Sequence, residues 1–98
     1  MNMKLNNPIQ SRAKSLLSID TPEERHELEK TRLHFAFLSG IERSMETQNI
    51  SREELAQRIG TSTGYLTELF RGTKSLNFDI LAKMKIALQV EFRVEVME

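Results

Sequence analysis

The spacing of hydrophobic and polar residues predicts a long helix from residue 21 onward. Thr21 and Glu24 have the spacing of a capping box, and Pro22 stands at the first helical position. The first turns carry almost only charged side chains, and apolar residues at helical spacing begin at Leu33. The predicted apolar face consists of Leu33, Phe37, Leu38, Ile41 and Met45. We therefore expect the second half of this helix to pack on a core, while the first half faces solvent or a partner.

Three shorter helices are predicted next, because capping residues recur at short intervals. The N-cap candidates are Ser51, either Thr61 or Ser62, and Asn77. Asn49 is expected to close the long helix, and Gly60 and Gly72 the next two, since these residues tolerate the left-handed conformation of a helix end. The residues predicted to face inward are Leu55, Ala56 and Ile59, then Leu66, Leu69 and Phe70, then Phe78, Leu81, Met84 and Leu88. Two of these helices are very short and meet at Gly60, which would leave the second one standing out from the surface.

From Val90 the period changes to strict alternation of apolar and charged residues, which predicts a β-strand over residues 90–97. A lone strand leaves its backbone amides and carbonyls unpaired, and no second strand is apparent in the sequence. Antiparallel pairing of two copies across a two-fold axis would solve this, and would bury Phe92, Val94 and Val96 in a homodimer. Pairing with the N-terminal arm of the same chain is the alternative.

The composition fits one small domain preceded by an arm. With 98 residues, 39% of them hydrophobic, we expect an arm over residues 1–20, in which Pro8 could start a short helix, and a domain over residues 21–98 with its core at 37–90. The 14 basic and 14 acidic side chains cancel, so any attraction to nucleic acid must be local. Cysteine is absent, which excludes disulfides and thiol chemistry. Since no apolar run is long enough for a membrane span and no signal-peptide core is visible, we expect a soluble, cytoplasmic protein.

The stretch ISREELAQRIGTSTGYLTELFRGTKSLNFDILAKMKIALQV resembles the core of the Xre/Cro-type helix-turn-helix repressors in spacing and residue classes. The matching positions are Ser51, the Leu55-Ala56 pair, Gly60, Leu66, Leu69, the Arg71-Gly72 close and the final ALQV. The resemblance implies an all-α fold, a five-helix helix-turn-helix domain with an N-terminal arm and one C-terminal strand that pairs across a homodimer. The chain departs from the family at Met45 and Phe70, where an Arg and a Glu are frequent; we expect these two to touch as an apolar pair. It departs again at Gly64, where the family often has a polar side chain.

The same resemblance implies that the second short helix enters the major groove of double-stranded DNA. The implied base-reading residues are Thr63, Gly64, Tyr65, Thr67 and Glu68. The implied phosphate contacts are Arg52, Ser62, Arg71, Thr73, Lys74 and Ser75. Two such helices in a homodimer would read a palindromic operator with half-sites about 34 Å apart. The alternative is a set of ordinary surface residues on a module that binds only protein.

A helix-turn-helix core followed directly by one strand is similar to the DNA-binding antitoxins of the HigA and HipB kinds. This resemblance implies a type II antitoxin that represses its own operon and neutralises a cognate toxin. The acidic start of the long helix would face that toxin, through Glu23, Glu24, Glu27 and Glu29. A solvated helix face is the alternative for this surface. A phage-type or chromosomal regulator without a toxin, and an adaptor that has lost DNA contact, are the alternatives for the whole chain.

Two histidines are the only candidates for metal chemistry. Glu23 and His26 have the spacing of half a carboxylate-bridged metal motif, and His34 lies two turns further along the same helix. Matching ligands on other helices are missing, and neither histidine has a visible nucleophile and orienting carboxylate. We therefore expect no metal, no cofactor and no enzymatic activity.

Overall fold

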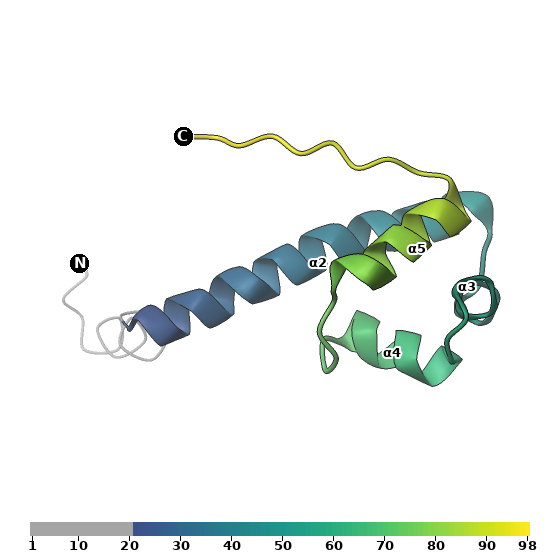
Figure 1. The fold of residues 1–98 in the computed structure, drawn as a ribbon, viewed down its shortest axis with the longest axis horizontal. Helices are drawn as coiled ribbons and strands as arrows, with labels where there is room; N and C mark the ends of the chain where they lie inside the picture. The colour runs from purple at the N-terminus through teal and green to yellow at the C-terminus, as the bar shows by residue number, and fades with distance from the viewer. Residues whose placement is uncertain (1–20) are drawn as a thin grey trace, which may run out of the picture. The chain divides into compact units, whose positions relative to one another are not determined.

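The computed structural model of the chain describes residues 21–98, which fold into four α-helices joined by short loops (Figure 1). The helices are α2 (Pro22–Gln48), α3 (Arg52–Ile59), α4 (Thr63–Arg71) and α5 (Phe78–Leu88). The predicted all-α class is confirmed for this part of the chain. The predicted arm and its short helix lie outside the described residues, so the fifth helix stays a prediction. The chain divides into two compact units, residues 1–30 and residues 31–98.

The described part of the first unit is the opening of α2, and it begins at the predicted capping box. The Glu24 amide donates to Thr21 Oγ1 at 3.0 Å, and the Thr21 amide lies 3.4 Å from Glu24 Oε1. Two of the otherwise unpaired amides at the helix start are thereby satisfied. The local sequence alone therefore determines where α2 starts.

The helix ends of the second unit also follow the prediction. Side-chain oxygens of Ser51, Ser62 and Asn77 accept from backbone amides three residues ahead, at 3.1, 3.0 and 2.8 Å. The left-handed residues predicted after α2, α3 and α4 have the expected positive φ angles. They are Asn49 (58°), Gly60 (77°) and Gly72 (97°). Gln89 closes α5 in the same conformation with φ 56°, which the sequence pattern did not predict.

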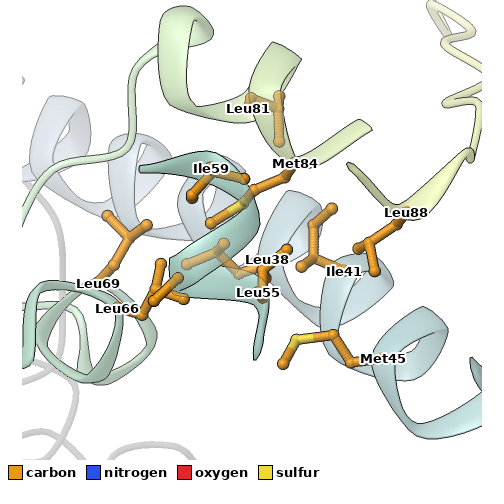
Figure 2. Packing of buried hydrophobic residues seen from close by; sticks show 11 residues of the cluster. Leu38, Ile41, Met45, Leu55, Ile59, Leu66, Leu69, Leu81, Met84 and Leu88 are labelled. Carbon is orange, nitrogen blue, oxygen red and sulfur yellow. The ribbon is translucent and has the colours of Figure 1, made fainter. Parts of the chain in front are cut away.

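Side chains from all four helices meet in one core within the second unit (Figure 2). The buried residues are Leu38, Ile41 and Met45 of α2, Leu55, Ala56 and Ile59 of α3, Leu66 and Leu69 of α4, and Leu81, Met84 and Leu88 of α5. Two predicted inward residues are wrong, because Leu33 is 61% and Phe78 is 79% exposed. Both have helical spacing to buried residues, but each lies about one turn before the buried or half-buried apolar residues of its own stripe, Phe37 and Leu81. Phe70 is half-buried against the core that contains Met45, and direct contact between the two stays a prediction.

Three side chains tie a helix to the carbonyl end of another helix. Gln48 of α2 donates to Leu88 O at 2.8 Å, and Arg58 of α3 donates to Ala87 O at 3.2 Å, so both hold the end of α5. Arg58 also donates to the Glu54 carboxylate at 2.6 Å. The third tie, from α2 to α4, belongs to the candidate interface described below. These bonds satisfy carbonyls that a helix end leaves without a partner.

Residues 90–98 follow α5 and form no strand in the single chain. The first part is anchored: the Val90 amide donates to Lys85 O at 3.1 Å, and the Phe92 ring packs edge-on against Phe37 at 5.2 Å between centroids. Val94 and Val96 are 73% and 84% exposed. The predicted strand and its pairing across a homodimer stay predictions.

Candidate nucleic-acid interface

A tight turn of three residues, 60–62, connects α3 to α4. Gly60 and Thr61 donate to the carbonyls of Gln57 and Ala56, at 3.3 and 2.9 Å, which closes α3 sharply. Ala56, whose carbonyl accepts from Thr61, is 2% exposed and belongs to the core. The turn therefore fixes the direction in which α4 leaves α3.

The second of these two helices, α4, buries one face and exposes another. Leu66 and Leu69 are fully buried, which orients the helix on the core. The five residues predicted to read bases fall in the remaining positions. Thr63 and Gly64 are exposed, and Tyr65, Thr67 and Glu68 are half-exposed. The first turn is thus the most accessible part of α4, and its N-cap hydroxyl is occupied by the Tyr65 amide.

Glu68 is drawn toward the loop after α4. The Thr73 hydroxyl lies 3.2 Å from Glu68 O and 3.3 Å from Glu68 Oε1. The structure thereby joins a predicted base-reading residue to a predicted phosphate contact. In this arrangement the Glu68 carboxylate, which would repel a phosphate, lies beside a residue predicted to contact one.

The cations predicted to contact phosphate lie on both sides of α4 in sequence. Arg71 and Lys74, with Thr73 and Ser75, are exposed at the C-terminal end of α4, and neither cation forms an ion pair with another described residue. Arg52, at the start of α3, stacks over the Phe70 ring at 5.0 Å and lies 3.9 Å from the Glu42 carboxylate. Stacking holds its guanidinium in place while leaving donors available.

The end of α4 is held by two neighbouring residues of α2 that the sequence pattern did not assign to this site. His34 Nε2 lies 2.8 Å from Leu69 O, and because a carbonyl only accepts, this nitrogen carries a proton. Beside it, Phe35 packs where a Cβ on Gly72 would lie 2.9 Å from the ring atom Cζ. The sequence pattern singled out His34 only as a candidate for metal chemistry; its partner, 35 residues away, could not be read from the sequence.

The remaining predicted residues lie on the exposed opening of α2. Glu23, Glu24, Glu27 and Glu29 are all exposed, with Glu24 engaged in the capping box and Glu27 3.3 Å from Lys30. Within residues 21–98, no three acidic or histidine side chains are arranged to hold a metal ion. No helix in this range is long and apolar enough to cross a membrane.

The family model described as helix-turn-helix matches residues 41–94, more than half of the chain. No curated protein and no solved structure gives a significant match. The matched segment contains α3, the turn at Gly60, α4 and α5. The chain therefore belongs to the Xre-type helix-turn-helix family and is a DNA-binding transcription regulator.

Proposed function

We propose that the protein represses transcription as a homodimer, with one α4 of each copy in the major groove of a palindromic operator. The observation that carries this proposal is the accessible first turn of α4 together with two cations at its other end, Arg71 and Lys74, which form no ion pair with any of residues 21–98. A groove-reading helix needs both features, since base edges give specificity and phosphates give affinity.

The proposed roles divide the interface by chemistry. Thr63, Tyr65 and Thr67 offer hydroxyls to base edges, and Gly64 leaves room for the backbone to approach. Glu68 would accept from a base amino group once Thr73 turns toward a phosphate. Arg52, Ser62, Arg71, Lys74 and Ser75 supply the remaining phosphate contacts, with Ser62 acting through the amides at the start of α4.

The proposed homodimer places the C-terminal segment against its copy. Phe92 is anchored on α2, whereas Val94 and Val96 are exposed at alternating positions beyond it. Antiparallel pairing of this segment would cover both valines and satisfy their backbone groups. We expect Val94→Glu combined with Val96→Glu to yield monomers in sedimentation equilibrium, while Arg93→Gln, on the opposite face, stays dimeric.

The test of DNA binding is a titration of the DNA directly upstream of the gene at several salt concentrations. Phosphate contacts predict that log K falls linearly with log salt, by roughly 0.9 per contact. Arg71→Ala and Lys74→Ala should each lower this slope and weaken binding to all sequences. Thr63→Ala should alter which sequence is preferred. Lys83→Ala removes an exposed cation paired with Asp79 on α5, and serves as the control with an unchanged slope.

Absence of binding at every salt concentration would refute this proposal and favour the adaptor alternative. Equal effects of Thr63→Ala and Lys74→Ala on all sequences would show that α4 is oriented differently on DNA.

A second proposed role, neutralising a toxin, is favoured by the exposed acidic start of α2. Glu23, Glu24, Glu27 and Glu29 present negative charge that a basic partner would complement. The test is co-expression with the product of the neighbouring gene. Glu23→Lys with Glu27→Lys should abolish rescue of growth, while DNA binding persists. If the neighbouring product is harmless alone, the regulator has no toxin partner there.

A further inference from the structure

The carbonyl end of the recognition helix is fixed by a side chain from α2. His34 donates from Nε2 to Leu69 O at 2.8 Å, and Leu69 itself is 0% exposed. The same carbonyl accepts from the Gly72 amide at 3.2 Å, so both its lone pairs are engaged. This bond joins two helices that are far apart in sequence, at the point where α4 stops.

The ends of α5 and α4 are held to different extents. Gln48 and Arg58 both bond carbonyls at the end of α5, at 2.8 and 3.2 Å. At the end of α4, His34 of α2 bonds the Leu69 carbonyl. Losing one tie at α5 leaves a second side-chain tie from another helix in place. Without His34, the end of α4 is held by the burial of Leu69, by the backbone bonds of Gly72 and by the Phe35 ring.

The residues that follow Leu69 include several of the proposed phosphate contacts. Arg71 follows two residues later, and Thr73 and Lys74 follow Gly72. The Phe35 ring, adjacent to His34, packs against Gly72 and restricts the loop from the other side. A shift of Leu69 O would therefore move both cations relative to the first turn of α4.

We propose that His34 is a positioning residue for DNA binding: its bond to Leu69 O sets the end of α4 so that Arg71 and Lys74 reach phosphates while the first turn is in the groove. This rests on the proposed function, and adds to it a residue that does not touch DNA. The role requires a donor at the distance of Nε2 from the backbone, not an imidazole.

The test compares His34→Gln, His34→Asn and His34→Leu in the full chain. A glutamine amide nitrogen reaches about as far as Nε2, an asparagine amide is one methylene shorter, and leucine has no donor. Each variant is titrated with the upstream DNA at a temperature where circular dichroism shows it folded. We expect His34→Leu and His34→Asn to bind about tenfold more weakly, as loss of a hydrogen bond and its geometry predicts, and to lose roughly one phosphate contact from the salt slope. His34→Gln should stay within about threefold of the unmodified protein.

Gln48→Leu is the matched control, because it removes a bond of equal length to the end of α5 instead of α4. It should lower the melting temperature about as much as His34→Leu, with DNA affinity and salt slope unchanged. If His34→Leu does not fold, the contrast between glutamine and asparagine decides. The proposal is overturned if His34→Leu or His34→Asn binds like the unmodified protein, if glutamine fails to restore binding, or if Gln48→Leu weakens binding equally. If the unmodified protein does not bind the upstream DNA, the proposed function itself fails. If it binds and only the variants behave otherwise than expected, the role of His34 alone fails.

Discussion

The segment from Ser51 to Gly72 and the segment from Phe78 to the end of the chain differ in how completely a single chain buries their apolar side chains. In the first, both helices start at a serine cap, end at a left-handed glycine and bury the predicted inner side chains apart from Phe70, which is half-buried. In the second, α5 has its cap, but Phe78, Ile86 and Val96 are 79%, 76% and 84% exposed. A cap depends on residues within one turn, whereas burial depends on which other element covers a face.

The largest expected effect comes from truncating one buried residue of the first segment. Leu66→Ala should lower the free energy of unfolding by about 2–5 kcal/mol, because Leu66 is 0% exposed and the core cannot fully close around the cavity. Phe78→Ala removes a larger side chain but should cost less than about 1 kcal/mol, because Phe78 is exposed in the single chain. Urea denaturation of both variants at low protein concentration measures the contrast.

A comparable loss for Phe78→Ala would mean that its ring is covered in the folded protein. If that loss grew with protein concentration, the cover would be a second copy of the chain, and the contrast between the two segments would reflect a missing partner.

A smaller effect is expected at two of the left-handed helix ends, Gly72 after α4 and Gln89 after α5. Gly72→Ala should destabilise by about 1–3 kcal/mol, since φ is 97° and an added Cβ would lie 2.9 Å from the Phe35 ring. Gln89→Gly should stabilise by up to about 1 kcal/mol, because glycine adopts φ 56° without a steric penalty. Thermal and urea denaturation give both values. A loss of stability in Gly72→Ala together with an equal gain in Gln89→Gly would show that Gln89 strains the end of α5, whereas glycine leaves the end of α4 unstrained. A neutral Gly72→Ala would contradict the described contact with Phe35.

The sequence was sufficient wherever the deciding residues are neighbours. The capping box at Thr21, the caps at Ser51 and Asn77, and the left-handed Asn49 and Gly72 were all predicted, because each depends on a few adjacent positions. Most of the core followed from helical spacing.

The sequence was insufficient wherever the partner is distant. His34 bonds Leu69, Gln48 bonds Leu88 and Arg58 bonds Ala87, across 35, 40 and 29 residues. No periodic pattern encodes a bond from a side chain to a distant carbonyl, because any residue supplies the same carbonyl. Leu33 and Phe78 show the limit of periodicity itself, since it gives the direction of a side chain but not where the covering helix begins.

Gly64 is the position within the first segment where local preference and structure disagree, and it carries the smallest expected effect. It lies in α4, where glycine costs about 1 kcal/mol relative to alanine, and a Cβ there would meet nothing closer than Ser62 Oγ at 3.9 Å. Gly64→Ala should therefore stabilise the protein by about 0.5–1 kcal/mol in urea denaturation, opposite in sign to Gly72→Ala. Since the added methyl is exposed on the first turn of α4, the same variant should bind upstream DNA more weakly if glycine there admits close approach of the backbone. Gain of stability with unchanged DNA affinity would mean that the glycine is merely tolerated, and loss of stability would contradict the open space described around it.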